Sequence, residues 1–159
     1  MTLQAKIVRA EVRDPEIYES FLLTGEDSDG RLEWIEVTVP FGQGPVYHIH
    51  HRADELFRVL DGELKVKLDG DYYDLQAGDV IFVPQGVPHT YTNVHPDRPV
   101  RMVGIYTPAG LQEFLNVWGK VTANGTPDEA TIAELGARFG QEACGPPLAV
   151  ELGLFEGTK

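Results

Sequence analysis

Residues 42 to 62 read GQGPVYHIHHRADELFRVLDG, and the rest of the chain is best understood from this stretch outward. His48 and His50 are one residue apart in a segment whose apolar residues are typical of a β-strand. Successive side chains on a strand point to opposite faces, so both imidazoles point the same way. Two histidines on one face of a strand predict a metal site.

A carboxylate and a third histidine extend this predicted site. Glu55 follows His50 by five residues, a separation that would place it on the opposite face of a straight strand. The polar residues 52–54 can form a turn or bulge that brings the carboxylate back to the imidazoles. His89 begins a second alternating segment at the end of the stretch 78–93. Three imidazoles and one carboxylate suit one divalent transition metal per chain, namely Fe, Mn, Ni, Co, Cu or Zn.

The spacing of these residues resembles the two sequence motifs of the cupin superfamily. Gly42, His48, His50, Glu55 and Gly62 match the first motif, and Gly78, Pro84, Gly86, His89 and Asn93 match the second. The short separation of the motifs resembles that of compact single-domain members. The resemblance implies an all-β fold, a jelly-roll barrel with the metal inside, bound by His48, His50, Glu55 and His89.

The C-terminal part of the chain has a different pattern. Leu111, Phe114, Leu115 and Trp118 recur at helical spacing, which predicts an amphipathic helix over 109–118. A second helix is expected to open with Thr126 as its N-cap and to end at Gly140. Segments 107–114 and 137–148 resemble the tail of small bacterial cupins described as quercetin 2,3-dioxygenase-like.

We therefore expect one cupin domain over residues 1–159. Residues 1–30 are expected to form an N-terminal arm and the first strands, 31–107 the barrel core and 108–159 the helical tail. Within the barrel, TGEDSDG is expected to be a hairpin loop between strands 21–23 and 32–39. The apolar run 80–83 is consistent with a fully buried strand, and 100–107 with the last barrel strand.

Composition narrows the classes of function. The chain has 159 residues, a formal net charge of -12 and one cysteine. An acidic surface repels phosphate, which argues against a nucleic-acid partner. One cysteine permits no internal disulfide, and neither a signal peptide nor a membrane-spanning stretch is visible, so we expect no membrane association and a cytoplasmic protein.

The candidate substrate-binding residues share a strand face with a ligand or lie on one face of the last barrel strand. They are Val46, Phe57, Tyr91, Met102 and Tyr106. Ordinary core packing is the alternative for each of them. Their low polarity suits a flat aromatic or polyketide-like substrate.

Three functions remain in view. The first, implied by the resemblance, is a metal-dependent dioxygenase that acts on a flavonol-like or other enolisable small molecule with dioxygen. In it, Glu55 either closes the metal's coordination shell or acts as a catalytic general base. The second is a non-oxidative metal-dependent cyclase, isomerase or decarboxylase, and the third is a non-catalytic small-molecule-binding module. The resemblance also implies a homodimer.

Overall fold

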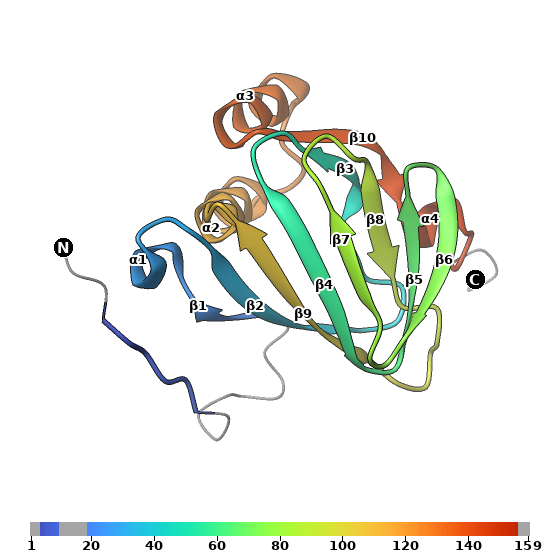
Figure 1. Ribbon diagram of the computed structural model, residues 1–159. Coiled ribbons are helices and arrows are strands. Elements are labelled where there is room, and N and C mark those ends of the chain that lie inside the picture. The colour runs from blue at the N-terminus through green and yellow to red at the C-terminus, as the bar shows by residue number, and fades with distance from the viewer. Residues whose placement is uncertain (1–3, 10–18, 156–159) are drawn as a thin grey trace.

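Two antiparallel five-stranded sheets form the body of the protein, as seen in the computed structural model, which describes residues 4–9 and 19–155 (Figure 1). One sheet has the order β1-β2-β9-β4-β7 and the other β10-β3-β8-β5-β6. The strands of the first sheet are β1 (Glu19–Leu23), β2 (Glu33–Val39), β9 (Val100–Thr107), β4 (Asp54–Asp61) and β7 (Val80–Val83). Those of the second are β10 (Gln141–Pro147), β3 (Val46–His50), β8 (His89–Thr92), β5 (Glu63–Leu68) and β6 (Asp71–Gln76). The predicted all-β jelly roll is confirmed.

Alternation of apolar and polar residues builds the core between the sheets. On β2, Ile35, Val37 and Val39 are at most 4% exposed. On β5, Leu64 and Val66 are buried in the same cluster. A strand with one face in the core must place every second side chain there, so the period of two fixes which residues face inward.

The predictions for the linker between β1 and β2 and for β7 are wrong. The linker between β1 and β2 is not a simple hairpin loop, because it contains the one-turn helix α1 (Gly25–Ser28). The side chain of Thr24 accepts a hydrogen bond from Asp27 N, and the Asp27 side chain accepts one from Thr24 N, which stabilises that turn. Strand β7 is not fully buried, since Val80 and Phe82 are 61% and 54% exposed. β7 is the edge of its sheet and only alternate side chains face the core.

The C-terminal part contains the two predicted long helices, α2 (Leu111–Thr122) and α3 (Glu129–Phe139), and then the one-turn helix α4 (Leu148–Glu151). The N-cap of α3 is Asp128 rather than Thr126, because the Asp128 side chain accepts the hydrogen bond from Thr131 N. Gly140 ends α3 in the left-handed conformation with a φ of 68°, as predicted. None of the helices among the described residues is long and apolar enough to span a bilayer.

β9 is not the last strand of the barrel, contrary to the prediction. Strand β10 follows α3 and pairs with β3. The end of α3 approaches β10 so closely that a Cβ at Gly136 would lie 2.5 Å from the carbonyl oxygen of Gln141. Glycine is therefore needed at this contact. β10 lies beside the strand that carries two of the predicted metal ligands.

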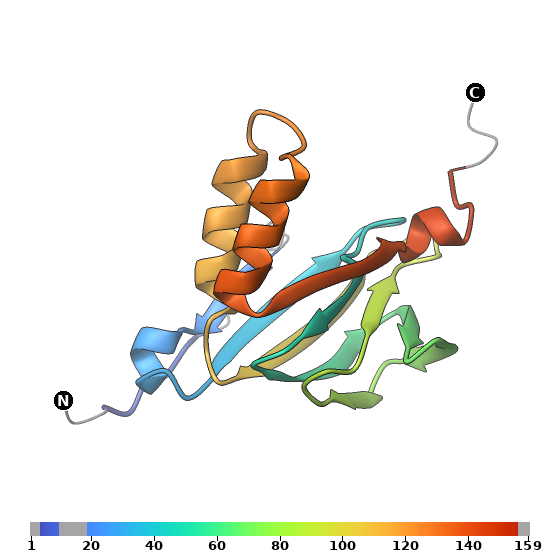
Figure 2. The ribbon, with the colours of Figure 1, turned by 90° about the horizontal axis from the view of Figure 1, so that it is seen from above.

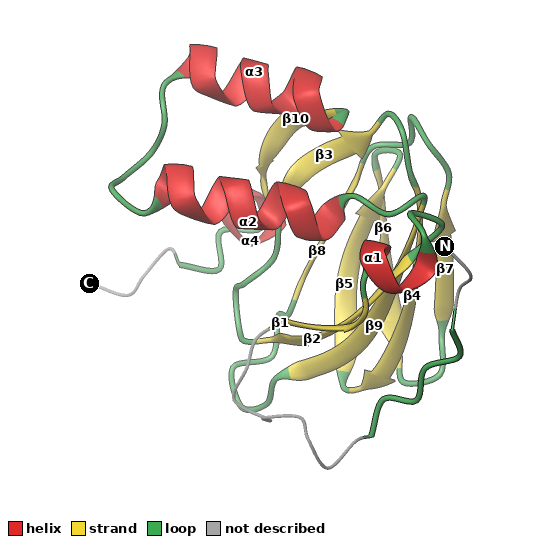
Figure 3. Ribbon diagram, turned by 90° about the vertical axis from the view of Figure 1, so that its left-hand side faces the viewer, coloured by secondary structure: helices red, strands yellow, loops and turns green. Residues whose placement is uncertain are grey.

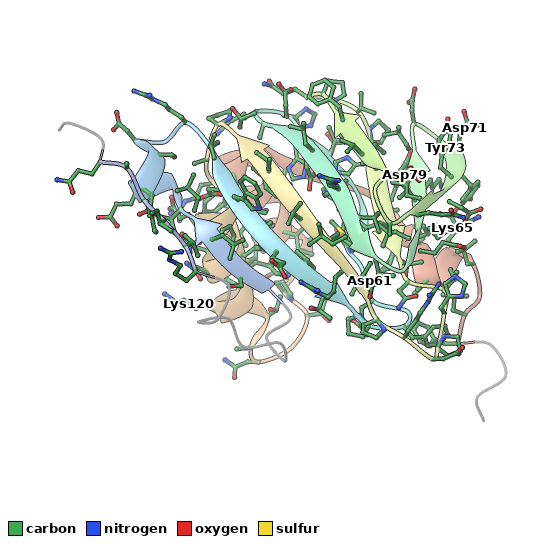
Figure 4. The ribbon with its side chains drawn as sticks, turned by 60° about the horizontal axis from the view of Figure 1, so that its bottom comes forward. Asp61, Lys65, Asp71, Tyr73, Asp79 and Lys120 are labelled. Carbon is green, nitrogen blue, oxygen red and sulfur yellow. The ribbon has the colours of Figure 1, made fainter. Side chains whose placement is uncertain are left out.

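The helices α2 and α3 form a hairpin that stands out from one side of the barrel, next to β10 (Figures 2 and 3). Asp71, Tyr73 and Asp79 lie at the opposite end of the molecule from Lys120 of α2 (Figure 4). The helical hairpin is thus separate from the acidic β6 end of the barrel.

Candidate metal centre

The four predicted ligands meet inside the barrel. His48 and His50 lie on β3, Glu55 on β4 and His89 on β8. One donor atom from each lies within 4.8 Å of the others. The odd separation of Glu55 from His50 is explained by topology, because β3 and β4 belong to different sheets and residues 51–53 cross between them. The turn therefore does more than reset a strand's alternation: it brings the carboxylate in from the facing sheet.

Most of the cluster is shielded from solvent. His50, Glu55 and His89 are 4%, 1% and 1% exposed, and His48 is half-buried. Nε2 of His50 is 3.0 Å from Nε2 of His48 and 3.1 Å from Oε2 of Glu55. Nε2 of His89 is 2.7 Å from the same carboxylate oxygen. Three ring nitrogens and one carboxylate oxygen thus converge from two sheets.

Backbone carbonyl groups fix the orientation of two of these rings. Nδ1 of His48 donates to the carbonyl oxygen of Val46 at 2.7 Å, and Nδ1 of His89 donates to that of Val87 at 3.0 Å. Because a carbonyl oxygen can only accept, the proton must sit on Nδ1, which leaves Nε2 of a neutral ring as a lone-pair donor. Nδ1 of His50 is buried and has no hydrogen-bond partner among the described residues.

Burial and the mutual contacts of the cluster shift its protonation. Burial alone would raise the pKa of Glu55, but hydrogen bonds with His50 and His89 outweigh it and lower the pKa to about 2. Burial lowers the pKa of His48 to about 3. Burial would also lower the pKa of His89, yet its hydrogen bond with Glu55 raises it. At neutral pH the site therefore presents an ionised carboxylate and a neutral His48.

These residues fit a divalent transition metal. A lone pair on His89 Nε2 that faces the Glu55 carboxylate at 2.7 Å is unfavourable unless a proton or a cation lies between them. The hydrogen bond with Glu55 raises the pKa of His89, which favours a proton at this position when no cation is bound. A bound cation would replace that proton, and the nitrogen and oxygen donors match borderline metals from Mn to Zn.

A cavity of about 840 Å³ opens from this cluster. Four of the five predicted substrate-binding residues line it, namely Val46, Tyr91, Met102 and Tyr106. Phe57 is 2% exposed and is not among the described lining residues; its ring packs against Tyr91 and His89, with centroids 5.5 Å and 6.1 Å apart. Phe57 shares the inward face of β4 with Glu55 but belongs to the buried core cluster, so it supports the site from within the core rather than from the cavity wall.

Part of the cavity wall comes from elements whose contribution was not predicted. Gln141 and Ala143 of β10 are the cross-strand neighbours of His50 and His48 and line the cavity. So do residues of α2 and α3, among them Phe114 and Trp118. The helical spacing in α2 identified an apolar face, but spacing alone does not tell what that face covers. His51 points away from the cluster to the cavity rim, where its Nε2 lies 2.6 Å from Oε2 of Glu142.

Comparison with known proteins agrees with this geometry. An uncharacterized protein of Methanocaldococcus jannaschii is 27% identical over 94 residues, which are 59% of this chain and 67% of that protein. Quercetin 2,3-dioxygenase of Bacillus subtilis is 42% identical over 52 residues, which are 31% of this chain but only 15% of that enzyme. The chain therefore spans a small part of the dioxygenase.

Solved structures show the same architecture. The structure of KdgF from Halomonas sp. superposes with a TM-score of 0.58 at 19% identity, over 69% of this chain and 99% of that one. At this identity the likeness establishes the fold alone. A family model described as the cupin domain matches residues 35–106, which include both motifs and all four clustered ligands. Over residues 35–106 the chain is therefore similar to the cupin domain.

Proposed function

We propose that this protein is a metal-dependent oxidoreductase of the dioxygenase type that acts on a flavonol-like or other aromatic, enolisable small molecule. The observation that supports the proposal is the cluster of His48, His50, Glu55 and His89, of which the first three line a large, mainly apolar cavity. The partial similarity to quercetin 2,3-dioxygenase supports the same chemistry. The low polarity of the cavity favours an aromatic substrate over a sugar or a phosphorylated one.

In this proposal the residues have two roles, to hold the metal and to contact the substrate. His48, His50, His89 and Glu55 would hold the metal, whose chemistry is to lower the pKa of a substrate hydroxyl group and to orient it. Tyr91, Met102, Tyr106 and Val46 would contact the substrate rings from the cavity wall. The buried, ionised Glu55 closes the ligand set, and its pKa of about 2 makes it a weak general base while it contacts His50 and His89.

Elemental analysis tests the metal site directly. The protein should be purified without a nickel column, as the native chain, as His48→Ala and as His51→Ala. His51 is the adjacent histidine and its side chain bonds Glu142 outside the cluster, so it is a matched control. We expect near-stoichiometric metal in the native chain and in His51→Ala, and little in His48→Ala. Metal-free native protein after anaerobic reloading would contradict the proposal.

Oxygen uptake then tests the reaction. With flavonols and related phenols, uptake should accompany loss of substrate in the native chain and be absent in His48→Ala. Substrate turnover without oxygen uptake would replace the dioxygenase with a non-oxidative cyclase, isomerase or decarboxylase. Saturable binding without turnover would indicate a small-molecule-binding module.

A further inference from the structure

The apolar face of α2 is turned toward the cavity. A surface helix usually buries its apolar stripe against the core. In α2, all of whose residues are described, none is buried. Leu111 and Leu115 pack against the edge of the core, whereas Phe114 and Trp118 lie one turn apart with their rings stacked at a centroid distance of 6.0 Å. All four residues line the cavity.

Helix α3 forms the facing wall and leaves space there. Its lining residues include Ala133, Gly136 and Ala137, whose side chains are small, together with Ile132 and Leu135. α3 contacts α2 through Phe139, whose ring meets that of Phe114 edge-on at 5.6 Å. The cavity is therefore continuous from the metal ligands to an aromatic pair on α2 and a wall of small residues on α3.

The size of the cavity exceeds what a small chelating molecule needs. Sites for drug-sized ligands span about 300–1,000 Å³, and this cavity, at 840 Å³, is in the upper part of that range. A molecule that fills it would touch the ligand cluster and the helices at once.

The charges along the wall select against an anionic ligand at the helix end. Glu129 of α3 and Glu142 of β10 line the rim, and the side chain of His51 is hydrogen-bonded to Glu142. No lysine or arginine is among the described lining residues. A carboxylate or phosphate placed there would lack a cationic partner and face two carboxylates, whereas an uncharged ring system would not.

We infer that α2 and α3 form a subsite for the uncharged, fused or linked aromatic rings of the substrate, the part that lies away from the metal ligands. That the oxygen-bearing edge of the substrate lies at the ligand cluster rests on the proposed function. The subsite on the helices does not depend on that function. It makes the helical hairpin a determinant of substrate size.

Trp118 reports on this subsite. The chain has two tryptophans, and Trp34→Phe removes the other one, which is 40% exposed on β2 and is not a described lining residue. In Trp34→Phe protein freed of metal with EDTA, flavone should quench the Trp118 emission saturably, because flavone has the ring system but no hydroxyl group for a metal. Unchanged or non-saturable emission would overturn the inference.

A pair of substitutions on α3 tests the size limit. Ala133→Phe fills part of the cavity, whereas Ala130→Phe places the same ring at an exposed position on the same helix that is not a described lining residue. Ala133→Phe should weaken flavone binding by about tenfold or more, and Ala130→Phe should change it by less than about twofold. Circular dichroism confirms that both variants fold. Equal effects of the two substitutions would contradict the subsite.

Two further probes separate this inference from the proposed function. In metal-loaded protein, 3-hydroxyflavone carries both the rings and a hydroxy-ketone edge, whereas maltol carries the hydroxy-ketone edge on a single ring. Ala133→Phe should weaken the binding of 3-hydroxyflavone and leave the binding of maltol unchanged. Flavone binding that depends on Ala133 without any oxygen uptake would sustain the subsite and refute the dioxygenase. Oxygen uptake that depends on His48 but not on Ala133 would do the reverse.

Discussion

Replacement of Asn93 by alanine should lower the free energy of unfolding by about 3 kcal/mol, the sum of three hydrogen bonds at about 1 kcal/mol each. Asn93 is 0% exposed. Its Nδ2 donates to the carbonyl oxygens of Val39 at 3.1 Å and Arg98 at 2.7 Å, and its Oδ1 accepts from the backbone N–H of His95 at 2.9 Å. The side chain thus ties the end of β2 to the loop that leads into β9.

Urea unfolding followed by circular dichroism measures this loss, and a thermal scan should show a melting temperature lower by about 6–12 °C. Asn116→Ala on the exposed side of α2 is the control and should change stability by less than about 0.5 kcal/mol. Asn93→Asp should be at least as destabilising at neutral pH, because a carboxylate would face two carbonyl oxygens. Each hydrogen bond is expected to contribute about 1 kcal/mol. If the free energy of unfolding of Asn93→Ala is within about 1 kcal/mol of that of the native chain, the three hydrogen bonds do not contribute as argued.

Further predictions address the backbone, pH, metal and assembly. Gly44→Ala should prevent accumulation of folded protein, because the new Cβ would lie 1.9 Å from a backbone carbonyl oxygen. In the control Gly70→Ala the new Cβ meets nothing within 4 Å, so only backbone strain is expected. The two variants are compared by soluble yield and melting temperature. A hydrogen bond with Lys6 and others with Thr24 lower the pKa of Asp27 from 3.8 to about 2, so its stabilising effect is complete above pH 3.8 and lost as the pH falls through about 2. Between about pH 5 and about pH 2, the range that spans both pKa values, the melting temperature of the native chain should accordingly fall more than that of Asp27→Asn. Equal falls in melting temperature for the two proteins would exclude this contribution. Saturating metal should stabilise the native chain by about 2.7 kcal/mol at a hundredfold excess of free metal over the dissociation constant, and should not stabilise His48→Ala. Melting temperatures with and without metal measure the difference. We expect light scattering to give twice the chain mass, since β7 leaves Val80 and Phe82 exposed at a sheet edge; a mass near 17.6 kDa would contradict the dimer.

The sequence was informative where a pattern had a single physical cause. Alternation on β2 and β5 identified the core-facing residues, and the spacing of the histidines placed them on one face. The place of Glu55 in the metal site was predicted from the resemblance and from a turn or bulge over residues 52–54. The alternation of side chains along a strand cannot show that the chain passes to the opposite sheet.

β10 could not be predicted in the same way. Its sequence, QEACGPP, contains glycine and proline residues, which weaken strand propensity. These residues are tolerated because β10 is an edge strand with irregular register against β3. For β7, four consecutive apolar residues gave no sign of which side would face solvent, since an edge position is decided by the partners a strand lacks.

The division of the ligands between the sheets has a mechanical consequence. His48, His50 and His89 belong to one sheet and Glu55 to the other, so an ion held by all four would be a cross-link between the two halves of the sandwich. Removal of the ion would then loosen the facing strands β3, β8 and β4 relative to one another. Amide hydrogen exchange in these strands should accelerate together on chelation, whereas the β5–β6 hairpin, which contributes no ligand, should keep its protection.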